Sequence, residues 1–303
     1  MENKENMYRV HVLLFIAVIG VSFSAILIKN TAAPASIIAM YRMLITFFLF
    51  LPVALIKGKK EIQELVRKDF LLCCVSGLFL ALHFITWMTS LKYTTVVSST
   101  VLVGLQPIFT AIIGYMLFKE RLSKKGFLGM LMAIGGSSMM GFLSFHAGRG
   151  HLYGNILALL GAFFGALYII IGRGIRKKIS TLTYGFIAYG TCSLFLVIMN
   201  IVLKLPFTGY TPKDYTLFFG MAVLCTIGGH TIFNWALKYI EANKIATTML
   251  GEPVGATFLA VLLLKEIPSL GQILSGIFIL SGLYIFMGTD KEKTEPLVTY
   301  SEG

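Results

Sequence analysis

Ten apolar stretches, each about as long as a membrane-spanning helix, follow one another along this chain with short loops between them. A helix needs about 20 apolar residues to cross the hydrocarbon core of a bilayer. Only 13% of the 303 residues are charged, whereas about a quarter are charged in a soluble domain. We therefore predict an all-α integral membrane protein. The predicted spans are 10–28, 35–56, 70–91, 96–118, 126–144, 153–172, 181–203, 215–237, 245–264 and 270–288.

The 26 Lys and Arg residues are distributed unevenly among the loops. With the N-terminus in the cytoplasm, 19 fall in cytoplasmic segments, six in outer loops and one, Arg42, within a span. An excess of Lys and Arg marks the cytoplasmic loops of membrane proteins. The pattern predicts a multi-pass protein of the cell membrane with both termini in the cytoplasm. It argues against nucleic-acid binding, which needs a basic patch on a folded polar surface.

The chain contains an internal repeat. Residues 101–120, VLVGLQPIFTAIIGYMLFKE, align without a gap with residues 247–266, TTMLGEPVGATFLAVLLLKE, so that Gln106-Pro107 falls on Glu252-Pro253. Each half has five spans, and because five is odd the second half must be inverted in the membrane relative to the first. Inverted repeats are typical of secondary transporters. We predict two inverted five-helix repeats, over residues 1–144 and 145–288, and a cytoplasmic tail over residues 289–303.

Two short motifs accompany this repeat, FKERL at 118–122 and LGEPV at 250–254, and the fifth and tenth spans are rich in glycine. With the five-plus-five spans, these features resemble the EamA-type members of the drug/metabolite transporter superfamily over residues 10–288. The resemblance implies a carrier that moves amino acids or other small metabolites, usually without ATP, through a central cavity between the halves. Gln106 stands where the second half has Glu252, so any role of charge rests on one half.

Two charged residues lie where the bilayer makes them costly. Arg42 is about seven residues into the second span, roughly 10 Å of helix rise from its end. It could bind a substrate carboxylate through its bidentate guanidinium, or pair with Glu252 or helix carbonyls. Glu252 could bind a substrate amine, carry a coupling proton or pair with Arg42, and a charge at this depth is by default a functional candidate.

Polar and aromatic side chains recur in the third and eighth spans. His83 and Trp87 share a helical face in the third span, and His230, Asn234 and Trp235 lie close together in the eighth. They either line a cavity in which a ring or cation could stack, or the tryptophans lie at the membrane interface and the histidines bond across helices.

Pro107 and Pro253 predict interrupted helices in the fourth and ninth spans. Proline removes one helical hydrogen bond, and in a membrane the freed carbonyl must find another donor. Glu252-Pro253 therefore predicts a helix break that lines a cavity. The charged pair Lys265-Glu266 at the end of the ninth span is either an interface anchor or a gate contact.

A row of small residues in the fifth span, Gly126, Gly129, Ala133 and Gly136, predicts close helix packing, within the chain or against a second protomer. We accordingly expect a monomer or a homodimer. The four cysteines lie in apolar runs without the spacing of a metal site, so we predict no metal, no cofactor and no disulfide.

Enzyme classes find no support in the motifs. The chain has no His-Glu-x-x-His, no Gly-x-Ser-x-Gly, no acidic pair inside the spans and no phosphate-binding loop for ATP. A channel would more typically show rings of like charge. We therefore predict a secondary carrier that works by alternating access, with a small-molecule substrate and a role for proton coupling left open. An amino acid or related zwitterion, exported, fits Arg42 and Glu252 best. Amphipathic drugs, nucleotide-like metabolites and import are the alternatives.

Overall fold

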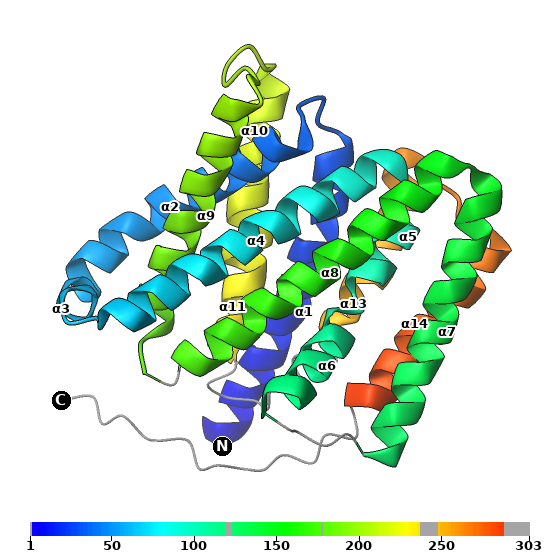
Figure 1. The fold of residues 1–303 in the computed structure, drawn as a ribbon, viewed down its shortest axis with the longest axis horizontal. Coiled ribbons are helices and arrows are strands. Elements are labelled where there is room, and N and C mark those ends of the chain that lie inside the picture. The colour runs from blue at the N-terminus through cyan, green and yellow to red at the C-terminus, as the bar shows by residue number, and fades with distance from the viewer. Residues whose placement is uncertain (1, 119–122, 177, 237–247, 288–303) are drawn as a thin grey trace.

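The computed structural model describes residues 2–118, 123–176, 178–236 and 248–287 (Figure 1). Within these ranges the chain is helical and contains no strand. Seven helical stretches there are long and apolar enough to cross a membrane, and Gly251–Leu264 and Leu270–Phe286 are shorter apolar helices. The elements are α1 (Glu2–Lys29), α2 (Ala35–Lys57), α3 (Lys59–Gln63), α4 (Arg67–Tyr93), α5 (Val96–Val103), α6 (Gln106–Phe118), α7 (Lys124–Ala147), α8 (Arg149–Ile175), α9 (Thr181–Val202), α10 (Pro212–Gly220), η1 (Met221–Thr231), α11 (Ile232–Ala236), α13 (Gly251–Leu259), η2 (Ala260–Leu264) and α14 (Leu270–Met287).

The outward faces of these helices carry large apolar side chains. Phe15, Ile56 and Leu262, for example, are 67%, 80% and 59% exposed. Water would be a poor solvent for such extensive apolar surface, whereas a bilayer accepts helices, whose backbone hydrogen bonds are satisfied internally. The structure thus has the surface of a multi-pass membrane protein.

The helices pack in pairs drawn from distant parts of the sequence. α4 runs along α8, α7 pairs with α14, and α2 pairs with α9, while α1 packs against η1 and α13 (Figure 1). Because successive long helices run in opposite directions, the bundle has two ends. We call them the Lys29 end, where α1 and α4 finish and α5 and α14 begin, and the Lys178 end, where α2 and α8 finish and α9 begins.

Glycine permits the closest of these helix contacts. A Cβ on Gly77 of α4 would lie 2.5 Å from the carbonyl oxygen of Ala188 in α9, and one on Gly129 of α7 would lie 2.6 Å from that of Gly282 in α14. Gly136 also faces α14. This part of the small-residue row in the fifth predicted span therefore packs within the chain.

Both predicted interruptions lie just before a proline. The turn at Gly104 and Leu105 separates α5 from α6, and Pro107 is the second residue of α6. A turn at Leu250 precedes α13, and Pro253 is its third residue. In the first turn of a helix proline gives up no intrahelical hydrogen bond, so each proline follows the interruption instead of causing it within a continuous helix.

The segment η1 is a π-helix of 11 residues. Its hydroxyls follow the same five-residue spacing, since Thr226 Oγ1 donates to the Met221 carbonyl at 3.3 Å and Thr231 Oγ1 to the Thr226 carbonyl at 3.2 Å. Such helices are rare and occur frequently at functional sites. This one marks α10–η1–α11 as a place to look for a site.

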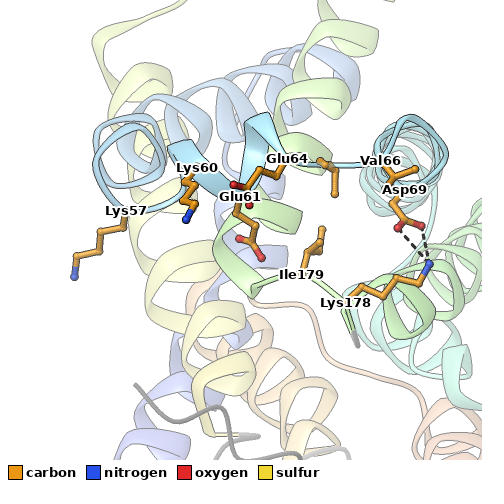
Figure 2. Close-up of a pocket in the computed structure, with 9 residues that line it drawn as sticks. Lys57, Lys60, Glu61, Glu64, Val66, Asp69, Lys178 and Ile179 are labelled. Carbon is orange, nitrogen blue, oxygen red and sulfur yellow. Dashed lines mark hydrogen bonds and ion pairs between the residues drawn. The ribbon is translucent and has the colours of Figure 1, made fainter. Parts of the chain in front are cut away.

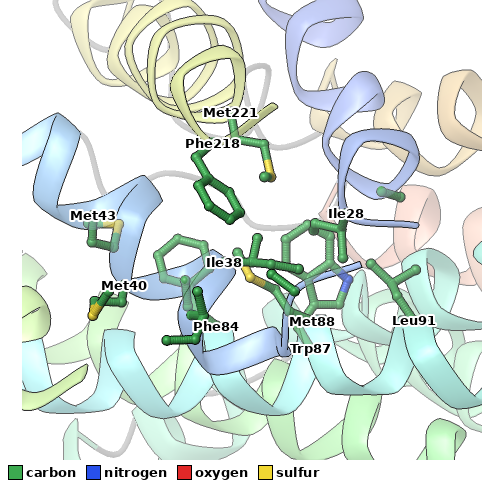
Figure 3. Packing of buried hydrophobic residues seen from close by; sticks show 14 of the residues in the cluster. Ile28, Ile38, Met40, Met43, Phe84, Trp87, Met88, Leu91, Phe218 and Met221 are labelled. Atoms are coloured by element: carbon green, nitrogen blue, oxygen red, sulfur yellow. The ribbon is translucent and has the colours of Figure 1, made fainter. Parts of the chain in front are cut away.

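An apolar core closes the interior toward the Lys29 end. Ile28 of α1 and Trp87 and Leu91 of α4 are 0%, 5% and 1% exposed and belong to one cluster of buried residues (Figure 3). Phe218 of α10 and Met221 of η1 join the cluster from a third side. Polar groups nearer the middle of the bundle are thereby separated from this end.

Candidate functional site

Arg42 is fully buried in the middle of the bundle. Its Nε donates to Thr226 Oγ1 at 2.9 Å and its Nη1 to Ser24 Oγ at 2.9 Å. The guanidinium carbon lies 4.8 Å from the centre of the Phe84 ring, a cation–π distance. The other terminal nitrogen, Nη2, has no hydrogen-bond partner among the described residues. Two hydroxyls thus hold the buried guanidinium, and its Nη2 remains available as a hydrogen-bond donor.

Three helices bring the hydrogen-bonded groups together, and α4 supplies Phe84. Arg42 comes from α2, Ser24 from α1 and Thr226 from η1. Gly20 lies one turn before Ser24, and a Cβ there would be 2.9 Å from the Leu224 carbonyl oxygen of η1. The close approach of α1 to η1 at this glycine lets both hydroxyls reach the guanidinium.

Glu252 is the second residue of α13 and keeps part of its surface accessible. The described residues hold no ion pair within 4.0 Å between Glu252 and Arg42, although the charge of each acts on the other. The direct pairing that the sequence left open is therefore absent from this structure. Two opposite charges face the same interior without touching.

His83 and Trp87 lie together in α4, with ring centroids 6.0 Å apart and nearly parallel planes. The Nδ1 atom of His83 is 2.8 Å from the Gly161 carbonyl oxygen of α8, so this histidine bonds across helices. Trp87 is buried among other side chains of the bundle, and its Nε1 has no partner among the described residues.

Gln106 reaches the same place from the start of α6. A Cβ on Gly165 of α8 would lie 2.3 Å from Gln106 Oε1 and 2.9 Å from His83 Nδ1. Only glycine leaves room for both side chains, so Gly165 is what brings Gln106 beside His83.

The residues predicted in the eighth span are divided between π- and α-helical segments. His230 lies near the end of η1 and is partly accessible, and the charges of Arg42 and His83 act on it. Asn234 and Trp235 belong to α11, but their side chains lie outside the described residues. The structure thus places His83, His230 and Glu252 each within electrostatic range of Arg42, and His230 also within range of His83.

Sequence reasoning missed the groups that hold Arg42. Ser24, Thr226 and Phe84 are not among the residues that the sequence indicates as site candidates. The five-residue spacing of Thr226 and Thr231 and the position of Thr226 one turn before His230 were the available signals. Neither points to Arg42, because that contact joins residues 184 positions apart.

A second polar junction lies between α4, α8 and α9. The hydroxyls of Tyr184 and Ser76 share a hydrogen bond of 2.5 Å, and Ser76 Oγ also lies 3.2 Å from the Tyr168 carbonyl oxygen. The hydrogen bonds of this junction are made by hydroxyl groups and a backbone carbonyl, and the charge of Arg176 acts on Tyr168 from nearby without entering those bonds. The hydroxyls position the helices through neutral hydrogen bonds, whereas the hydrogen bonds at Arg42 come from a charged group.

Two further hollows are lined by other residues. A groove of about 1170 Å³ between α1, α13 and α14 is lined mainly by apolar side chains, with Ser22 and Gly255 on its wall. A smaller one of about 600 Å³ lies at the Lys178 end, where Lys178 and Asp69 form an ion pair of 3.1 Å near Lys57 and Lys60 (Figure 2). Within the described residues, no group of His, Cys, Asp and Glu could hold a metal ion.

The fold is an apolar helical bundle with a buried cation and partly accessible polar side chains in its interior. These features are typical of a membrane transport protein. The chain belongs to the EamA-like transporter family, whose model matches residues 9–142 and again residues 152–288. Transport of a small molecule across a membrane follows from that membership.

The relatives of this chain are named as transporters, and one of them is named for its substrate. An uncharacterized transporter of Methanothermobacter thermautotrophicus is 25% identical over 78% of this chain and 69% of its own length. A riboflavin transporter, ImpX, of Fusobacterium nucleatum subsp. nucleatum is 26% identical over 69% of each chain. A crystal structure of 16% sequence identity shares the fold with a TM-score of 0.65, covering 92% of this chain and 97% of that one.

Proposed function

We propose that this chain is a secondary carrier that exports a small zwitterionic metabolite, such as an amino acid, by alternating access. Its ten spans form two inverted five-helix repeats, over residues 1–144 and 145–288, with both termini in the cytoplasm. Arg42 binds the carboxylate of the substrate. Glu252 binds its amine or carries the coupling proton.

The helix contacts support the inverted repeat. If the first and sixth spans correspond, and likewise the third and eighth, each contact should recur with its partners exchanged. α1 packs on η1 and α8 packs on α4, and α1 packs on α13 as α8 packs on α6. The pairs α2 with α9 and α7 with α14 map onto themselves. Two matches of one family model in one chain are also expected of a repeat.

The observation that carries the substrate proposal is the unpartnered Nη2 of a fully buried arginine. Buried donors are almost always paired, so a guanidinium with a free face is poised for an acceptor that arrives from outside the chain. A carboxylate matches its planar geometry. Glu252 supplies the opposite charge nearby without occupying that face, which suits a ligand with one group of each sign.

The test is counterflow in proteoliposomes preloaded with unlabelled amino acids and supplied with labelled ones, together with riboflavin as a separate arm. Arg42→Ala and Glu252→Gln are run beside Arg67→Ala, which removes an exposed arginine. We expect one or more amino acids to exchange, both buried variants to lose exchange and Arg67→Ala to keep it. If the protein is folded and exchanges no amino acid, the proposal of a zwitterionic substrate is wrong. If Glu252 carries the proton, Glu252→Gln removes the pH dependence of transport.

A planar aromatic metabolite is the second candidate. The observation in its favour is the stacked pair of His83 and Trp87 beside Gln106, together with riboflavin as the substrate for which the Fusobacterium relative is named. Ring faces and an amide suit a flat heterocycle with a hydrogen-bonding edge. Exchange of riboflavin without exchange of any amino acid would select this candidate.

A further inference from the structure

Glu266 ties three helical elements together at the Lys29 end. Its carboxylate oxygens lie 3.1 and 3.4 Å from Lys29 Nζ at the end of α1. Both oxygens also accept from the backbone N–H of Val96, the first residue of α5, at 3.2 Å. A carboxylate at a helix N-terminus meets the positive end of the helix dipole. One side chain thus joins α1 and α5 to the segment between η2 and α14.

The local backbone holds Glu266 in that position. Lys265 has a left-handed conformation, with φ of 55°, and ends η2. The Glu266 N–H then returns to the Ala260 carbonyl oxygen at 3.2 Å. This turn directs Glu266 inward, so of the two roles the sequence left open for it, the structure disfavours an interface anchor.

Neighbouring contacts close the same end. Lys92 Nζ donates to the Thr31 carbonyl oxygen at 2.6 Å, and Gln272 Nε2 donates to Thr95 Oγ1 at 2.9 Å. Ile28 and Leu91, which directly precede Lys29 and Lys92 in the chain, belong with Trp87 to the buried apolar cluster (Figure 3). A polar layer therefore covers an apolar one between the Lys29 end and Arg42.

We infer that Glu266, with Lys29 and the Val96 N–H, is the gating contact that shuts the Lys29 end of the carrier. It joins elements from both halves of the chain, so a movement of one half against the other must break it. At the opposite end, the ion pair of Lys178 and Asp69 joins the start of α4 to the segment before α9. Glu266 is a positioning residue for transport and does not touch the substrate. The inference rests on the proposed alternating access.

The test measures accessibility, so it needs no substrate and a wrong substrate leaves it intact. Ile28→Cys places a thiol in the buried layer beneath Glu266, and a membrane-impermeant maleimide is added to intact cells and to inside-out vesicles. The unchanged chain, with its four native cysteines, gives the background. We expect slow labelling of Ile28→Cys alone. Adding Glu266→Gln should raise the labelling rate from one face by about tenfold, as losing a charge-assisted hydrogen bond shifts a two-state equilibrium.

Asp69→Asn is the matched control, because it breaks an ion pair of the same 3.1 Å length at the opposite end. It should leave labelling of Ile28→Cys unchanged. Equal labelling with and without Glu266→Gln, or an equal rise with Asp69→Asn, overturns the inference. Lys29→Gln keeps the bond to Val96 and should give a smaller rise, and it decides the question if Glu266→Gln does not fold.

Discussion

The junction around Arg42 and the junction around Tyr184 occupy corresponding places under the proposed repeat. In the first, α2 contributes Arg42, α1 contributes Ser24 and η1 contributes Thr226. In the second, α9 contributes Tyr184, α8 the Tyr168 carbonyl and α4 Ser76. One junction holds a full charge with unused donors, and the other holds hydroxyl groups that satisfy one another.

The difference distinguishes the groups that are needed to hold the helices together from those that are needed to bind a substrate. Each junction fastens two helices of one half to one helix of the other, and a tyrosine hydroxyl is sufficient for that. A buried guanidinium is far more costly and adds nothing to the frame that Tyr184 does not supply at its own junction. We therefore attribute the charge at Arg42 to substrate binding and the hydroxyls at Tyr184 to structure.

The largest effect is expected from Arg42→Met, which removes the charge and keeps an apolar side chain of similar length. Replacing a buried charge by a well-packed apolar group is often neutral for stability. We expect counterflow to fall at least about a hundredfold, as when one partner of a buried charged pair is removed, while the unfolding temperature stays near that of the wild type. Normal exchange by this variant would break the comparison, because the charge would then have no functional role.

Gly165→Ala should have the next largest effect. The new Cβ would lie 2.3 Å from Gln106 Oε1 and 2.9 Å from His83 Nδ1, so those side chains must move. We expect about a tenfold rise in the KM of transport, less than the roughly hundredfold loss that misplacing a group by about 1 Å can cause.

Gly174→Ala is the control in the same helix, since nothing lies within 4 Å of its Cβ. It should leave KM unchanged and add about 0.5–1 kcal/mol of stability, the usual gain of alanine over glycine in a helix. A KM change of the same size in both variants would assign the effect to α8 as a whole.

Tyr184→Phe sharpens the comparison from the structural side. It removes the hydroxyl that bonds to Ser76 and should cost about 1 kcal/mol, the net value of one hydrogen bond. Transport should remain close to that of the wild type. A double-mutant cycle with Ser76→Ala, read by thermal unfolding, isolates the pair, and a fall in counterflow larger than the fall in stability would show a direct role in binding.

The smallest effect is expected at Glu61, which holds the start of α9 near Tyr184. Burial raises the pKa of this carboxyl, but hydrogen bonds from the hydroxyls of Ser180 and Thr183 and from the Ser180 N–H lower it further, so the pKa lies below its ordinary value of 4.5. A lowered pKa means that Glu61 stabilises the fold above about pH 4.5 and loses this effect as the pH falls through the lowered pKa.

Thermal unfolding at neutral pH and near pH 3.5 measures the contribution of Glu61, with Glu61→Gln as the comparison. The drop in unfolding temperature should be slightly larger for the wild type, since exposed charges contribute at most about 1 kcal/mol. An identical drop in both proteins would show that Glu61 does not help to stabilise the junction around Tyr184.

The sequence predicted those features that follow from the need of a helix to span an apolar bilayer. Apolar stretches predicted the helices, and depth within a stretch identified Arg42 and Glu252 as residues of interest. It was uninformative where long-range packing decides. The hydrogen-bond partners of Arg42 come from α1 and η1, and the only trace of the π-helix in the sequence is the five-residue spacing of Thr226 and Thr231, which does not point to Arg42. Whether Arg42 and Glu252 touch depends on helix positions that neither residue reveals.

The π-helix η1 has a mechanical consequence. Each of its hydrogen bonds encloses one residue more than an α-helical bond, so its 11 residues are wound more loosely than in the flanking α10 and α11. Return of the same residues to α-helical bonding would lengthen the segment and turn Thr226 and His230 about its axis. Such a screw motion would change the position of the Thr226 hydroxyl relative to Arg42. A change between π- and α-helical bonding would therefore alter both the length and the rotation of η1 beside Arg42.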